Sequence, residues 1–178
     1  MVRDAAENSS RKESMSPPRS LHVWMRLTMT KFDCQFWLPV PRTRVFPFFA
    51  DPMNLAAITP EQLQFRVLTP GPIEMRQGAR MEYEFRLWGL RLGWASEITA
   101  WEPMTRFVDE QRRGPYKVWI HEHLFADRDG GTLITDKVTY ATAGGRLVER
   151  WMVGKELRRI FEHRERRLRE ILGGTPTA

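Results

Sequence analysis

The sequence predicts an α+β domain in which an antiparallel sheet is crossed by one long C-terminal helix. Between about residues 63 and 141, six strand-like segments follow one another, each bounded by Gly, Pro or Asp-Gly turn signals. Such short connections join antiparallel neighbours. Residues 145–172 then contain no proline and place apolar side chains at helical spacing. The expected order is one strand, two short helices, six strands and the long helix.

The first part of this domain is predicted to be a strand and two short helices. Residues 32–38 alternate between apolar and polar side chains apart from one tryptophan, which is typical of a strand. Residues 41–58 predict the two helices, and Asp51 is a favourable N-cap for the second. Pro47 removes a backbone hydrogen bond inside the first helix, so we expect a kink or an early end there.

The remaining elements follow from turn signals and periodicity. The long helix would measure roughly 40 Å at 1.5 Å per residue, enough to cross a whole sheet. Its predicted apolar stripe consists of Leu147, Trp151, Leu157, Phe161, Leu168 and Leu172. The six later strands are predicted at 63–68, 79–89, 90–101, 106–113, 117–126 and 132–141.

Length and local composition divide the chain into three parts. The 178 residues suffice for one domain with a sizeable core. Residues 1–30 are polar, contain Ser and Pro, and lack periodicity, which predicts a disordered N-terminal tail. The domain is expected over 31–172 and a flexible C-terminus over 173–178. The tail is compatible with a translation start at Met1, Met25 or Met29.

Charge and cysteine content exclude several classes of function. The net charge is +6 and the pI about 10.0, but the arginines of the long helix alternate with glutamates and no nucleic-acid motif accompanies them. We therefore expect a solvated helix face and no nucleic-acid partner. No run is long enough to insert into a membrane. The single cysteine, Cys34, excludes an internal disulfide, and a cytoplasmic protein is expected. The sequence leaves the oligomeric state open.

The segment GPYKVWIHEHLF contains two histidines, His121 and His123, which a strand would place on one face. The Asp-Gly pair at 129–130 predicts a two-residue type I′ hairpin after this strand. That turn sets Asp136 opposite His123. The other face of the hairpin carries a Glu–Lys pair and two threonines, so the histidine face is predicted to point inward.

The preceding hairpin brings a second acid to the histidines. A three-residue turn at 114–116 sets Asp109 opposite His121, whereas a two- or four-residue turn sets Glu110 there. Inward polar groups need partners or water. Two interpretations remain open: core hydrogen bonds that fix the strand register, or the polar end of a ligand cavity.

Other chemistry is less well supported by the residues. Cys34 alternates with core positions, and the body has one serine, Ser96, in mid-strand, so a nucleophilic enzyme is not indicated. His121, His123 and Asp136 have the composition of a two-His, one-carboxylate site, but spacing alone is a weak signal. We therefore expect no metal and no cofactor. General acid–base catalysis by His121 or His123, with Asp136, stays an alternative.

Several segments resemble the SRPBCC superfamily, which includes START lipid-transfer domains and birch-pollen-type allergens. They are LPVPRTRVFPFFADPMNLAAITP, FRVLTPGPIEMRQGARMEYEFRLWG, RFVDEQRRGPYKVWIHEHLF and GTLITDKVTY. The nearest set is the bacterial ligand-binding or polyketide cyclase/dehydrase-like one. The resemblance implies a helix-grip fold, with seven antiparallel strands wrapped around the C-terminal helix and two short helices after strand one.

The resemblance also implies a function. The expected function is binding of a small, largely hydrophobic molecule in the cavity between sheet and helix. The alternative is a cyclase- or dehydratase-like lyase or isomerase without a cofactor, so whether the chain is an enzyme stays open. The expected ligand-binding residues are Tyr83, Phe85, Trp119, Phe125 and Tyr140 for apolar surface, and Asp109, Glu110, His121, His123 and Asp136 for the polar end.

Overall fold

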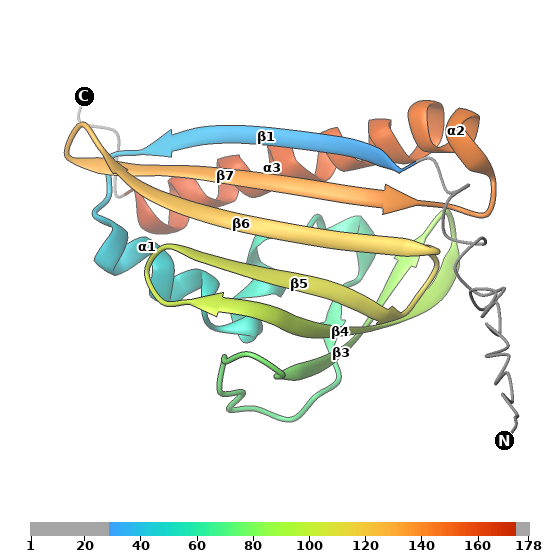
Figure 1. The fold of residues 1–178 in the computed structure, drawn as a ribbon, viewed down its shortest axis with the longest axis horizontal. Coiled ribbons are helices and arrows are strands. Elements are labelled where there is room, and N and C mark those ends of the chain that lie inside the picture. Colours follow the sequence, from blue (N-terminus) through green and yellow to red (C-terminus); the bar gives the residue numbers. More distant parts are fainter. Residues whose placement is uncertain (1–28, 174–178) are drawn as a thin grey trace, which may run out of the picture.

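Seven antiparallel strands form one curved sheet in the computed structural model (Figure 1). The structure describes residues 29–173, apart from the side chain of Arg146, so the tail predicted over 1–30 lies almost wholly outside the described residues. The order across the sheet is β1-β7-β6-β5-β4-β3-β2. The strands are β1 (Thr30–Leu38), β2 (Arg66–Val67), β3 (Arg80–Leu87), β4 (Leu90–Glu102), β5 (Arg106–Arg113), β6 (Val118–Arg128) and β7 (Gly131–Ala141).

The sheet is a meander of hairpins from β2 to β7, closed by β1 against β7. The β6–β7 turn has positive φ at both Asp129 (47°) and Gly130 (73°), as a type I′ turn requires. It pairs Arg128 with Gly131, so the predicted register is confirmed. The predicted strand at 63–68 is only two residues long in the structure, because a 3₁₀ turn, η4 (Glu61–Leu63), precedes it.

The two predicted short helices cover one end of the sheet. They are α1 (Arg42–Phe49) and the 3₁₀ helix η3 (Pro52–Ile58). Asp51 caps η3 as predicted, since its Oδ1 accepts a hydrogen bond from the Met53 amide at 2.9 Å. Pro47 lies inside α1, and the helix ends two residues later, at Phe49.

The predicted long helix is divided into three parts: α2 (Gly145–Val148), a π-helical turn η5 (Glu149–Val153) and α3 (Gly154–Leu172). Leu157, Phe161, Leu168 and Leu172 are buried, but the prediction for the first part of the stripe was wrong. Leu147 and Trp151 are 75% and 61% exposed. The π turn is the physical reason, because its i→i+5 bonding shifts the helical phase, so that Leu147 of α2 and Trp151 of η5 fall outside the stripe of α3.

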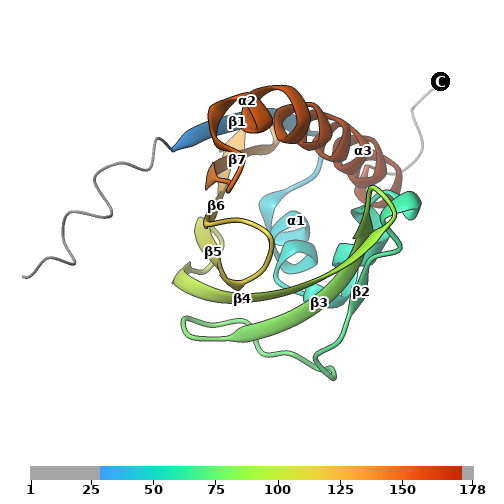
Figure 2. The same cartoon turned by 90° about the vertical axis from the view of Figure 1, so that its right-hand side faces the viewer.

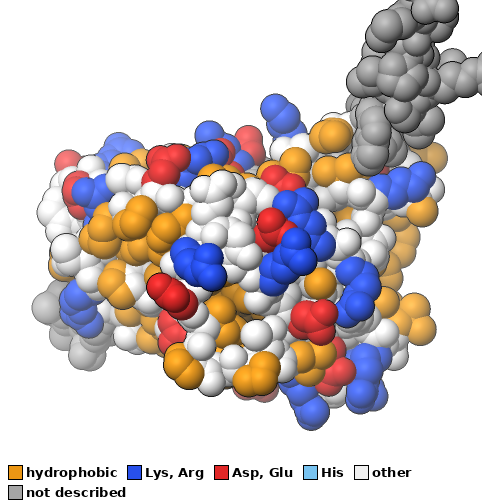
Figure 3. Space-filling view, turned by 60° about the horizontal axis from the view of Figure 1, so that its bottom comes forward, with side chains coloured by type: hydrophobic (Ala, Val, Ile, Leu, Met, Phe, Trp, Pro, Cys, Tyr) orange, Lys and Arg blue, Asp and Glu red, His pale blue; other side chains and the backbone are white. Residues whose placement is uncertain are grey.

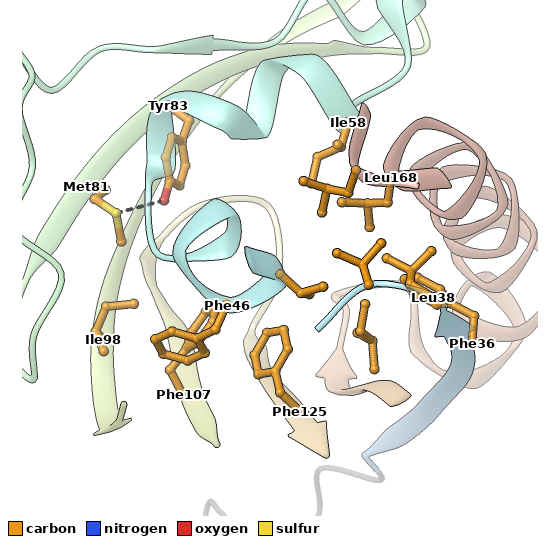
Figure 4. Close-up of a cluster of buried hydrophobic side chains, with 14 of the residues drawn as sticks. Phe36, Leu38, Phe46, Ile58, Met81, Tyr83, Ile98, Phe107, Phe125 and Leu168 are labelled. Carbon is orange, nitrogen blue, oxygen red and sulfur yellow. Dashed lines mark hydrogen bonds between the residues drawn. The ribbon is translucent and has the colours of Figure 1, made fainter. Parts of the chain in front are cut away.

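Figure 2 looks along the strands and shows the sheet curving around α1, with α3 closing the open side. Figure 4 shows the core that fills one end of this curve, where Phe46 of α1 lies beside Phe107 and Phe125 of the sheet. Phe46 is 5.3 Å from Phe125 between ring centroids. Leu168 of α3 and Ile58 of η3 complete this end of the core (Figure 4).

The outer surface carries charges of both signs. On the face in Figure 3, basic and acidic side chains alternate with small apolar areas. Ion pairs on the outside of the sheet include Arg80–Glu97 at 2.8 Å and Arg106–Glu122 at 2.5 Å. Among residues 29–173, no helix is long and apolar enough to cross a membrane.

Candidate functional site

A cavity of about 200 Å³ lies between the curved sheet, the short helices and α3. Strands β3 to β6 supply one wall, and α3 with η3 and the end of α1 supply the other. Most of the lining is aromatic or aliphatic. The aromatic lining residues are Phe48, Phe49, Phe65, Tyr83, Phe85, Trp88, Trp94, Phe107, Tyr116, Trp119 and Phe161.

Three adjacent strands bring four polar residues together at one point of this wall. Asp109 of β5 pairs with His121 of β6, which confirms the register given by a three-residue turn. Asp136 of β7 pairs with His123 of β6, as the type I′ turn predicts. Because opposite and alternate positions share a face of the sheet, all four side chains point to the inner side.

Each imidazole lies between the two carboxylates. His121 Nε2 is 2.8 Å from Asp136 Oδ1, and its Nδ1 is 3.6 Å from Asp109 Oδ2. His123 Nε2 is 3.1 Å from Asp109 Oδ2, and its Nδ1 is 2.9 Å from Asp136 Oδ1. The contact between His123 Nδ1 and Asp136 Oδ1 is close but poorly aligned for a hydrogen bond. The interaction between these two atoms is therefore mainly electrostatic. The two rings lie 3.8 Å apart between centroids.

Burial and charge act in opposite directions on these groups. Burial lowers the pKa of His121, and the neighbouring His123 lowers it further. Burial also opposes the charge of His123, but its contacts with Asp109 and Asp136 outweigh that effect and raise its pKa. Burial likewise disfavours the charge of the two acids, yet their contacts with the histidines hold the pKa of Asp109 and of Asp136 below the usual range. The cluster therefore favours ionised acids.

Arg164 of α3 approaches the cluster from the opposite wall. Its Nη1 lies 3.7 Å from Asp136 Oδ1, and its guanidinium carbon lies 4.8 Å from the Phe161 ring centroid. Its Nε and Nη1 are buried and make no hydrogen bond within the described part of the chain. Arg164 thus supplies positive charge beside Asp136 at the edge of the cavity.

The structure brings together some of the predicted site residues and separates others. Tyr83, Phe85, Asp109, Trp119, His121 and His123 line the cavity. Asp136 is buried behind the two histidines and does not line it. Glu110 pairs with Ile120 and faces outward, where it contacts Arg112 at 3.0 Å.

Phe125 and Tyr140 share the inner face but lie outside the cavity lining. Phe125 is covered by Phe46 and Phe49 of α1, with centroids 5.3 and 5.0 Å away. Tyr140 donates its hydroxyl hydrogen bond to the Glu149 carbonyl at 3.1 Å and is covered by η5. Helices pack over both ends of the inner face and leave its middle free.

Sequence reasoning missed two lining residues of particular interest. Trp94 pairs with Tyr83 across the β3–β4 hairpin, so the same register argument could have found it. Arg164 lies three residues after Phe161 on the apolar stripe of α3. This spacing indicates a side chain on the buried face of the helix. The expectation that the arginines of the long helix lie on a solvated face is therefore wrong for Arg164, which is only 9% exposed.

Comparison with solved structures identifies the architecture. The protein CV1439 from Chromobacterium violaceum superposes with a TM-score of 0.66 at 16% identity, covering 82% of this chain and 98% of that one. The chain has the helix-grip fold that its sequence predicts. The solved structures with a similar fold also include ginseng major latex-like protein 151 from Panax ginseng, with a TM-score of 0.62, 14% identity, and coverage of 81% of this chain and 97% of that one.

A further structure of the helix-grip fold is protein Ms6760 from Mycobacterium smegmatis, with a TM-score of 0.63 at 21% identity, covering 80% of this chain and 90% of that one. No family model matches the chain, and no curated protein sequence matches it. At these identities the likeness concerns the fold. The function of the helix-grip domain in this chain is therefore argued from its own residues.

Proposed function

We propose that the protein binds a small, largely apolar molecule in the cavity between the sheet and α3. The observation that carries this proposal is the cavity itself, about 200 Å³ in volume and lined mainly by aromatic and aliphatic side chains. Binding of an apolar molecule to such a surface is favourable, because it removes apolar area from contact with water. The resemblance to the SRPBCC superfamily supports the same function.

The polar cluster gives such a molecule an orientation. His121, His123 and Asp109 line one part of an otherwise apolar wall. A few placed polar groups in an apolar pocket fix the direction of a bound molecule, because a buried polar atom needs a partner. A ligand with one hydrogen-bonding group and an apolar body fits this arrangement.

The proposal is tested with the neutral apolar fluorophore N-phenyl-1-naphthylamine. Trp94 and Trp119 line the cavity with ring centroids 5.2 Å apart, so a bound fluorophore receives energy from them. Ile160→Trp, which fills the cavity from α3, is expected to weaken binding at least about tenfold by steric exclusion. Native mass spectrometry of the protein as purified from its host would identify a retained ligand.

Ile171→Trp is the matched control, since Ile171 is on the same helix, 38% exposed and outside the cavity lining. Its binding should equal that of the unmodified protein. Absence of probe binding to the folded protein, or equal binding by both variants, would refute the cavity as the binding site.

A further inference from the structure

Asp109, His121 and His123 present three metal-ligating atoms to one point at the cavity wall. Asp109 Oδ2 is 3.1 Å from His123 Nε2 and 3.6 Å from His121 Nδ1, and the three atoms all lie within 4.8 Å of one another. Ligand atoms around a tetrahedral zinc ion lie about 3.3–3.6 Å apart, because zinc binds nitrogen and carboxylate oxygen at about 2.0–2.2 Å. The separations of 3.1 and 3.6 Å lie close to this range.

Asp136 occupies the position of a supporting carboxylate behind both histidines. Its Oδ1 lies 2.8 Å from His121 Nε2 and 2.9 Å from His123 Nδ1, the ring nitrogens that face away from Asp109. A carboxylate in this position orients an imidazole, by a hydrogen bond for His121 and by its charge beside Nδ1 for His123, and leaves the lone pair of the other nitrogen for a metal. Asp136 has no exposed side-chain area, so its orientation is fixed by the core.

With both histidines neutral, the cluster carries one unbalanced negative formal charge. Asp109 and Asp136 carry two negative charges, and Arg164 balances one of them from 3.7 Å on the Asp136 side. Within residues 29–173, no lysine or arginine lies within 4.0 Å of Asp109. Two neutral histidines would leave an unbalanced negative charge at Asp109, and partial burial of this side chain, which is 20% exposed, makes that charge costly. A proton or a metal ion between Asp109 and the imidazoles removes this cost.

We propose that Asp109, His121 and His123 bind a divalent first-row transition-metal ion, with Asp136 orienting both imidazoles. Two histidines and one carboxylate leave open coordination positions on such an ion. These positions face the apolar cavity, because all three ligands line it. Water or a polar atom of a bound molecule completes the coordination. The metal-site proposal does not depend on which apolar molecule the cavity binds.

This proposal revises the expectation that the chain binds no metal. The sequence pattern suggested Asp136 as the carboxylate ligand, and spacing alone was a weak signal. The structure instead places Asp109 on the cavity side and Asp136 on the core side of the histidine pair. A complete ligand set with a supporting carboxylate is a stronger indication than two histidines in alternate positions.

Cobalt(II) is the probe that tests the site, because its visible absorption reports coordination number. Titration of the metal-free full chain with Co²⁺ should give one equivalent with the bands of four- or five-coordinate cobalt, and Zn²⁺ should displace it. Asp109→Asn and His121→Ala should each abolish stoichiometric binding. Asp136→Asn should weaken it about 10- to 100-fold through the orientation of the imidazoles. His163→Ala on α3, away from the cluster, should leave it unchanged.

Thermal unfolding of every variant shows which of them are folded, and Asp109→Asn preserves side-chain shape if His121→Ala does not fold. A folded chain that binds no Co²⁺, or that binds it equally after Asp109→Asn and His121→Ala, overturns the proposal. Binding of N-phenyl-1-naphthylamine is measured on the same metal-free samples. Probe binding without Co²⁺ binding refutes the metal site alone, and Co²⁺ binding without probe binding refutes the apolar cavity alone.

Discussion

His121 and Asp136 form the shortest contact of the polar cluster, 2.8 Å from Nε2 to Oδ1, although they are diagonal rather than opposite on strands β6 and β7. The diagonal contact leaves Asp136 without exposed side-chain area, whereas Asp109 keeps 20% of its side chain exposed. The two acids contact the same histidines, but Asp136 does so from the core and Asp109 from the cavity. Their contributions to stability should therefore differ.

Asp136→Ala is expected to lower the free energy of unfolding by about 3 kcal/mol, because it leaves the buried Arg164 without its acid and each histidine without one of its two carboxylates. Asp109→Ala should lower it by less than about 1 kcal/mol in metal-free buffer, since water in the cavity can take the vacated place. Denaturant titration measures both. Equal losses would contradict the assignment of Asp136 to the core and Asp109 to the cavity.

Glu149→Ala should lower the free energy of unfolding by about 1–3 kcal/mol, because buried hydrogen-bond partners lose their acceptor. Glu149 is 1% exposed, and it accepts hydrogen bonds from the Thr30 hydroxyl at 2.5 Å and from the Thr142 amide at 2.7 Å. Denaturant titration of Glu149→Ala against Glu162→Ala, an exposed glutamate of α3, gives the difference. Equal stability of the two variants would show that the contacts of η5 with β1 contribute little.

Gly131→Ala is expected to destabilise the protein by more than about 2 kcal/mol, since a bulky group forced into a packed site shifts its neighbours. A Cβ at Gly131 would lie 2.1 Å from the Leu38 carbonyl oxygen and 2.9 Å from the Trp37 ring. Gly93→Ala is the control, because a Cβ there meets no atom within 4 Å. Gly93→Ala should be neutral or slightly stabilising. Thermal unfolding of the two variants measures the difference. Equal unfolding midpoints would contradict the steric argument for Gly131.

Cys34 should react slowly with a disulfide reagent in the folded protein. Burial, with a smaller contribution from the charge of Asp136, raises the pKa of Cys34 to about 12. A raised thiol pKa lowers the reactive thiolate fraction, so labelling at pH 8 should be at least about 100-fold slower than in guanidinium-unfolded protein. Absorbance of the released thiolate gives both rates. Comparable rates would show that the thiol is neither buried nor held protonated.

The sequence by itself determined the order of elements along the chain, the register of the β6–β7 hairpin and the face on which the histidines lie. Each of these depends on local signals. The type I′ turn at 129–130 sets β7 against β6, and alternation then assigns every side chain to a face. For the turn before β6 the sequence left Asp109 and Glu110 as alternatives beside His121, and the structure places Asp109 there.

Only the tertiary structure decided which inward residues meet the cavity. Phe125 and Tyr140 satisfy the same alternation as His121 and His123, but α1 covers one and η5 covers the other. The position of a helix on a sheet depends on non-local packing, so the periodicity of the helix and of the strands does not predict it. The contact between Arg164 of α3 and Asp136 likewise depends on where the helix packs on the sheet. The different roles of Asp109 and Asp136 follow from it too, since the cavity lies on one side of the histidine pair and the packed core on the other.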